Sequence, residues 1–208
     1  GSLGKTECWY ILDCPEGATL VVGHNAADKE ECARMIHEGR WSEFIREVPV
    51  HKGDFVSIVP GTVHAIKAGV MLLETQQNSD ITYRVYDYDR LSNGKKRELH
   101  VEKSIDVINA PAAPAENSIH NFAEVEKNKP VLMEKSAYYR VWKLVTDAGV
   151  ELSMKKDFDA EYLLVSVVSG NGTVNGTDIK KGDHFIAVNG CEELNLTGDM
   201  ELIISAEV

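Results

Sequence analysis

The sequence predicts a mainly β protein made of two modules, with a small helical insertion in the first module. Short apolar runs separated by Gly, Pro and Asn fill most of the chain, which is the pattern of strands and turns. One stretch of helical character interrupts these runs. A phrase that combines a turn and a strand also occurs twice, which indicates two related β modules.

The first module is expected to hold five short strands and one clear helix. The helix is predicted over 27–39, with Asp28 as its N-cap and Gly39 closing its C-terminus. A second short helix is expected over 42–46. The strands are predicted at 8–12, 19–22, 54–59, 70–73 and 81–86.

The stretch APAAPAEN at 110–117 is the best candidate for a linker, because it is rich in Pro and Ala and lies between two strand-rich parts. A boundary near residue 112 gives modules at 1–112 and 113–208. The second module is expected to contain strands at 138–145, 162–168, 184–188 and 201–205.

The repeated phrase reads HKGDFVSIVPG at 51–61 and KKGDHFIAVNG at 180–190. Each copy places Lys-Gly-Asp before an apolar strand, which predicts a turn with Gly at the position that requires a positive φ. His64 follows the first copy closely, whereas the second continues Cys191-Glu192-Glu193. A metal site that belongs to this motif can therefore lie only in the first module.

Charge and composition exclude several classes of protein. The 208 residues carry 22 basic and 33 acidic side chains, a net charge of −11, which argues against nucleic-acid binding. No apolar run is long enough for a membrane span. Four cysteines without C-x-x-C spacing predict reduced thiols in a cytoplasmic protein. Gly1-Ser2 is typical of tag removal, so 208 need not be the natural length.

Three side chains in the first module could carry chemistry. His64 follows a strand and could point into the mouth of a barrel as a metal ligand, or be an ordinary structural histidine. Glu74 follows three apolar residues and is either an inward general base or an outward strand residue. Arg84 shares parity with Glu74 and suits a phosphate group, although a surface ion-pair network explains it equally well.

Lys5 and Glu7 lie two residues apart near the start of the chain, so in a strand they share one face. Glu7 could ligate a metal ion. By themselves, charged residues near a terminus are usually exposed to solvent.

Together, three phrases resemble the type I mannose-6-phosphate isomerases, in particular the short bacterial form. They are GKTECWY at 4–10, PGTVHA at 60–65 and LETQQNSDITYRVYDY at 73–88. The resemblance extends over essentially the whole chain. It implies a cupin-type (jelly-roll) barrel in each module and one zinc ion.

The resemblance also implies roles for individual residues. Glu7 and His64 correspond to zinc ligands, and Lys5 corresponds to an active-site lysine. Glu74 matches an active-site carboxylate, and Arg84 resembles the arginine implicated in proton transfer or phosphate contact. The family takes two further zinc ligands from a Gln-x-His-Pro segment upstream, and no Gln-x-His occurs here. The first module is therefore expected to be truncated, with two of four ligands.

The expected reaction interconverts mannose 6-phosphate and fructose 6-phosphate through an enediol. Two alternatives stay open: a metal-dependent cupin of other chemistry, such as epimerisation or oxygenation, and a non-catalytic cupin that binds a sugar phosphate. For the chain as given, we expect weak zinc binding and little activity. Exposed strand edges left by truncation predict a homodimer or a domain swap.

Overall fold

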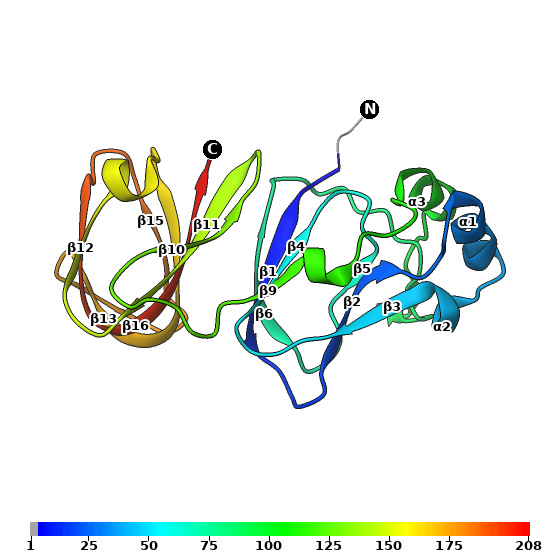
Figure 1. Ribbon diagram of the computed structural model, residues 1–208, viewed down its shortest axis with the longest axis horizontal. Coiled ribbons are helices and arrows are strands. Elements are labelled where there is room, and N and C mark those ends of the chain that lie inside the picture. The colour runs from blue at the N-terminus through cyan, green and yellow to red at the C-terminus, as the bar shows by residue number, and fades with distance from the viewer. Residues whose placement is uncertain (1–3) are drawn as a thin grey trace. The chain divides into compact units, whose positions relative to one another are not determined.

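The computed structural model describes residues 4–208, so the Gly1-Ser2 start lies outside the described residues. The chain divides into two compact units, Gly1–His120 and Asn121–Val208 (Figure 1). The stretch that resembles a linker is packed on the first unit, because Ala115 contacts its core and Arg46 Nη2 donates to the Ala113 carbonyl at 2.7 Å. The units are described separately below.

The strands of the first unit form two main sheets around one apolar core. The four-stranded sheet has the order β6-β1-β4-β9, and the three-stranded sheet has the order β3-β2-β5. In β1, β2 and β4, alternate apolar residues belong to this core, while most of the intervening residues are also buried. The strands of these sheets are β1 (Glu7–Asp13), β2 (Thr19–His24), β3 (Ile45–Pro49), β4 (Asp54–Ile58), β5 (His64–Ala65), β6 (Met71–Gln76) and β9 (Ile119–Asn121).

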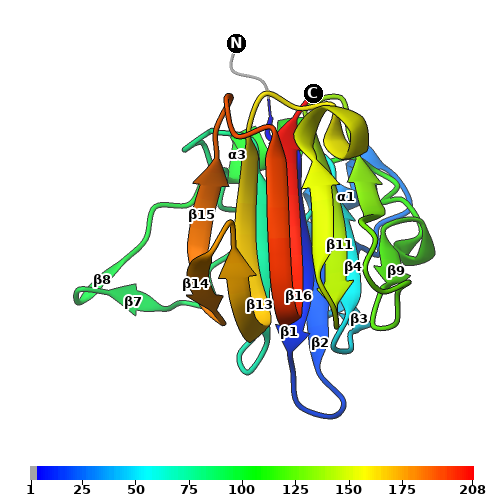
Figure 2. The ribbon, with the colours of Figure 1, turned by 90° about the vertical axis from the view of Figure 1, so that its left-hand side faces the viewer.

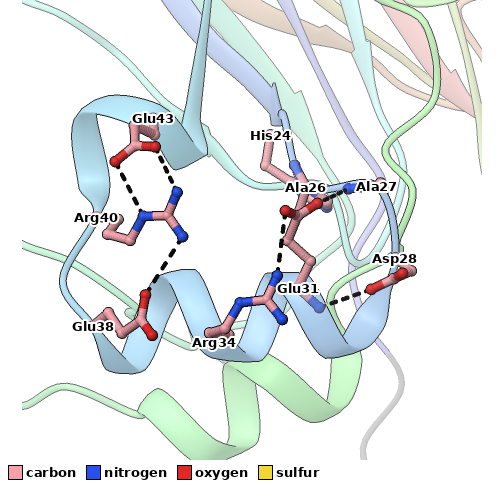
Figure 3. Close-up of polar contacts among 9 residues, drawn as sticks. All are labelled: His24, Ala26, Ala27, Asp28, Glu31, Arg34, Glu38, Arg40 and Glu43. Atoms are coloured by element: carbon pink, nitrogen blue, oxygen red, sulfur yellow. Dashed lines mark hydrogen bonds and ion pairs between the residues drawn. The ribbon is translucent and has the colours of Figure 1, made fainter.

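Three helices gather at one end of the first unit in Figure 1: α1 (Lys29–His37), α2 (Trp41–Phe44) and α3 (Val101–Val107). The predicted cap of α1 is confirmed, since Asp28 Oδ1 accepts from the Glu31 backbone N–H at 2.8 Å (Figure 3). Glu31 in turn accepts from the Ala27 N–H at 2.8 Å, so one side chain satisfies a free donor of the first turn and the other a donor just before the cap. Gly39 follows the helix with φ +67°, as predicted.

Three local predictions need correction. The second helix is α2, which ends at Phe44, so Arg46 lies in β3 instead. Helix α3 was not anticipated. The predicted strand at 81–86 does not form, because β6 ends at Gln76 and the chain then runs irregularly to a small hairpin of β7 (Leu91–Ser92) and β8 (Lys95–Lys96).

The second unit is built on one seven-stranded sheet, whose main order is β10-β11-β16-β13-β14 (Figure 2). Its buried side chains form a single core that includes Trp142, Phe158 and Leu202. The helical turn η1 (Ala115–Asn117) precedes this unit, and the π-helical turn η2 (Met154–Phe158) lies within it. The strands are β10 (Val131–Lys135), β11 (Tyr139–Thr146), β12 (Val150–Ser153), β13 (Leu163–Val174), β14 (Thr177–Lys180), β15 (His184–Ala187) and β16 (Glu193–Glu207).

The repeated Lys-Gly-Asp phrase forms the same turn in both units. Gly53 and Gly182 have φ values of +88° and +91°, as predicted. In each turn the Asp side chain accepts from the backbone N–H three residues earlier, at 2.7 Å for Asp54 and 2.8 Å for Asp183. The turn therefore belongs to the framework of both units.

None of the four cysteines forms a disulfide within residues 4–208. Within residues 4–208, no helix has both the length and the apolar character needed to cross a membrane.

Candidate functional site

The site begins on the inward face of β1. Strand alternation places Ile11, Trp9 and Glu7 on the same side, and both apolar residues belong to the core. Glu7 is the first residue of β1 and is only 2% exposed. A carboxylate so buried costs free energy unless it is paired, so Glu7 requires partners.

Two basic side chains meet the Glu7 carboxylate. Lys5 Nζ lies 2.5 Å from Oε2, and His64 Nε2 lies 2.6 Å from Oε1. Burial by itself raises the pKa of Glu7, but the contacts with His64 and Lys5 outweigh it and hold the pKa below its ordinary value. The three residues that were predicted separately thus form one cluster.

His64 comes from the other sheet, where β5 pairs with β2. Its Nδ1 lies 2.8 Å from the Thr62 carbonyl, so this nitrogen carries a proton and donates. Burial lowers the pKa of His64, but the contact with Glu7 exceeds this effect and raises the pKa overall. The ring also packs edge-on against Trp9 at 5.5 Å between centroids. These contacts fix both the tautomer and the orientation of the ring.

Glu74 lies beside this cluster, because β6 pairs with β1 in the register Trp9↔Glu74. Trp9 Nε1 donates to Glu74 Oε2 at 3.2 Å, and Lys5 Nζ lies 4.0 Å from Oε1. The side chain is 34% exposed. Lys5 Nζ also donates to Gln76 Oε1.

Arg84 is held at the rim by the backbone of a neighbouring segment. The Arg84 N–H donates to His100 Nδ1 at 3.2 Å, and the His100 N–H donates to the Arg84 carbonyl at 2.7 Å. The guanidinium Nη1 donates to the Glu98 carbonyl at 3.2 Å. No single extended strand joins Glu74 to Arg84, so the predicted shared face is replaced by a loop that folds back.

All five predicted residues line one open cavity of about 770 Å³, which lies wholly within the first unit. Its walls combine the polar cluster with apolar and aromatic side chains, among them Val59, Ile66 and Tyr83. Such a mixture is typical of a site for a small polar ligand. Trp9 and His100 were not predicted as contributors; only the parity of Trp9 with Glu7 could have signalled the first.

The donors present fit part of a zinc site. A metal-ligating histidine usually donates its second ring N–H to a carbonyl, as His64 does to Thr62. Its Nε2 and a buried Glu7 oxygen face each other, and both are suitable zinc donors. Among residues 4–208 no group of three or more His, Cys, Asp or Glu could hold a metal ion. The described residues thus offer two positions of a site that normally needs three or four.

Taken together, the fold and the site define a two-unit cupin protein with a polar cavity in the first unit. Residues 136–207 match the family model "Mannose-6-phosphate isomerase, cupin domain". The chain is 45% identical over 210 residues to mannose-6-phosphate isomerase ManA of Bacillus subtilis and 42% identical to mannose-6-phosphate isomerase of Streptococcus mutans. The chain is therefore similar to the bacterial mannose-6-phosphate isomerases over nearly its whole length, which confirms the resemblance drawn from its motifs.

The relatives are longer than this chain. The alignments take in 99% of the chain but only 65% of each of these two relatives. The solved mannose 6-phosphate isomerase of Bacillus subtilis superposes with a TM-score of 0.80 at 36% identity, covering 99% of this chain and 65% of the other. A putative mannosephosphate isomerase from Archaeoglobus fulgidus, at 14% identity and a TM-score of 0.74, covers 100% of this chain and 62% of that one and shares the fold.

Proposed function

We propose that this chain carries the acid–base part of a mannose-6-phosphate isomerase active site, which interconverts mannose 6-phosphate and fructose 6-phosphate. The observation that carries the proposal is the cluster of Lys5, Glu7, His64 and Glu74 in one cavity. The identity of 40–45% to bacterial isomerases supports the choice of substrate.

In this reaction a proton leaves C2 of the aldose and a proton is added to C1, while negative charge develops on the O1 and O2 oxygens of the enediolate. Glu74 is the group we assign to the proton transfer, because it lines the cavity and its carboxylate does not contact Glu7 or His64 directly. The Trp9 N–H orients its carboxylate. Lys5 lies within 4.0 Å of Glu74 and can stabilise the developing charge.

Arg84 supplies a second positive charge at the same cavity. We assign it to contact with the substrate, as either a proton-transfer partner or a phosphate contact. Its anchored backbone keeps the guanidinium in place when the ligand arrives.

We further propose that the cofactor is one zinc ion held by Glu7 Oε1 and His64 Nε2 together with donors other than those two side chains. When bound, such an ion acts as a Lewis acid towards sugar oxygens. The contact between Glu7 and Lys5 Nζ neutralises the second carboxylate oxygen and so keeps this buried group in position.

The test is an isomerase assay on mannose 6-phosphate with added Zn²⁺, comparing this chain with a longer version extended to the length of its curated relatives. We expect turnover by the longer version and incorporation of solvent deuterium at C1 of fructose 6-phosphate. The Glu74→Gln variant should lose both, because an amide cannot accept the proton. Absence of turnover in the longer, zinc-loaded protein would refute the proposal.

The presence of only two zinc donors among residues 4–208 favours one alternative, a cupin that binds a sugar phosphate without converting it. Binding of mannose 6-phosphate that leaves the sugar unaltered in the longer protein would support this reading. In either case we propose a cytoplasmic location, in keeping with four cysteines that form no disulfide.

A further inference from the structure

A second polar cluster lies in the same cavity, built from Asp87, Arg90 and Arg97. Asp87 is 5% exposed, and its carboxylate accepts from Arg97 Nε at 2.8 Å, from Arg97 Nη2 and from Arg90 Nη2 at 2.8 Å. Arg90 Nε also donates to the Asp87 carbonyl at 3.3 Å. One buried anion thus holds two guanidinium groups.

The β7–β8 hairpin explains why the two arginines meet. Its register pairs Leu91 with Lys96 and Ser92 with Lys95 around the Asn93-Gly94 turn, so Arg90 and Arg97 come next to each other at the base of the hairpin. Like charges placed opposite each other in a hairpin repel. Asp87 compensates only one of the two charges, and the cluster keeps a net charge of +1.

The arginines retain capacity for another anion. The contacts with Asp87 use Nε and Nη2 of each guanidinium, and the Nη1 groups have no partner within residues 4–208. The side chains of Arg90 and Arg97 are 62% and 38% exposed. Arg90 is further fixed over the ring of Tyr88, with 5.7 Å between its Cζ and the ring centroid.

The cavity as a whole also favours an anion. Its lining contains four positive side chains and three negative ones, in a chain whose net charge is −11. The contacts with Arg97 first, and then with Arg90, hold the pKa of Asp87 well below its usual range, so Asp87 stays ionised and the clamp stays assembled.

We propose that Arg90 and Arg97, positioned by Asp87, form a clamp for the phosphate group of the sugar phosphate. Planar guanidinium groups with free N–H donors match phosphate oxygens, and two such groups set side by side can share one phosphate. The proposal rests on the proposed function for the identity of the sugar. The anion clamp itself can be tested without turnover.

The experiment titrates this chain with fructose 6-phosphate, fructose and inorganic phosphate. The arginine Nε–H signals are followed by NMR. We expect fructose 6-phosphate and phosphate to shift the Arg90 and Arg97 signals, and fructose to leave them unchanged. In Arg90→Gln, which keeps the pair of Arg97 with Asp87, affinity for fructose 6-phosphate should fall about tenfold, the effect of one charge-assisted hydrogen bond. The Arg90→Lys variant should lose less affinity for fructose 6-phosphate than Arg90→Gln does.

Arg34→Gln is the matched control, because Arg34 is 54% exposed and pairs with Glu31 outside the cavity. It should leave affinity unchanged. Equal affinity of Arg90→Gln and the unchanged chain would overturn the clamp, and so would an equal loss in Arg34→Gln or equal binding of fructose. Normal turnover of Arg90→Gln with unchanged KM would refute the clamp alone. Intact phosphate binding without isomerisation in the longer version would refute only the proposed function.

Discussion

The buried Glu7 carboxylate offers a sharp test of the site, through the isosteric substitution Glu7→Gln. In the unchanged chain each carboxylate oxygen faces one basic side chain, Lys5 at 2.5 Å and His64 at 2.6 Å. An amide carries no negative charge, so Lys5 loses its counter-ion, and only a neutral His64 ring can meet the amide NH2 group. The free energy of unfolding of the first unit should therefore fall by about 1.5–3 kcal/mol, the contribution of one charge-assisted hydrogen bond.

This loss corresponds to a roughly 10- to 150-fold increase in the unfolding equilibrium constant. Urea denaturation of chains labelled with 5-fluorotryptophan can show which unit loses stability, because Trp9 reports on the first unit and Trp142 on the second. We expect the Trp9 transition to move to lower urea and the Trp142 transition to stay in place.

The matched control is Glu102→Gln, since Glu102 also pairs with a histidine, His37, at 2.9 Å, but on the surface. Exposed pairs contribute little, so this variant should unfold as the unchanged chain does. If Glu7→Gln costs less than about 0.5 kcal/mol, or if Glu102→Gln costs as much, Glu7 is not the buried, doubly paired group described above.

Three further predictions concern pH, the repeated turn and zinc. Burial lowers the pKa of His24 below 6.5, so its contribution to stability is full above pH 6.5 and is lost as pH falls through the lowered value. Urea midpoints of the unchanged chain and His24→Gln should therefore differ less at acid than at neutral pH, and a constant difference would refute this. Gly182→Ala should cost about 1–2 kcal/mol because φ is +91°, whereas Gly149→Ala in the same unit should be nearly neutral by the same denaturation assay. Calorimetric titration should show weak binding of Zn²⁺ to this chain, and tight binding with normal turnover would contradict the count of two donors.

The sequence predicted the framework well where the signals were local. The cap at Asp28, the glycine turns and the predicted strands other than 81–86 depend on a few neighbouring residues and formed close to their predicted places, whereas β3, β9, β10, β12 and β14 were not anticipated. Helix α3 was missed although Val101, Ile105 and Ile108 have helical spacing and pack in one core cluster.

The site was less predictable because its contacts join distant parts of the chain. Spacing could place Lys5 and Glu7 on one face, but it could not show that His64 of the other sheet meets them. The pair of Arg97 with Asp87 was likewise hidden, because the β7–β8 hairpin brings them together across ten positions of the chain. The resemblance to a family, rather than the pattern of residues, selected the five candidate residues.

The two units share the geometry of the repeated turn but not the histidine that follows it in the first unit. Gly182 and Gly190 stand 129 positions after Gly53 and Gly61, and at the same offset His64 is matched by Glu193. A doubled ancestor would explain this spacing, with one copy keeping an imidazole and the other diverging at that place. The second unit then has the same turn as the first but lacks its histidine. A histidine and its partners can be introduced there one at a time, to find how few residues create a binding site.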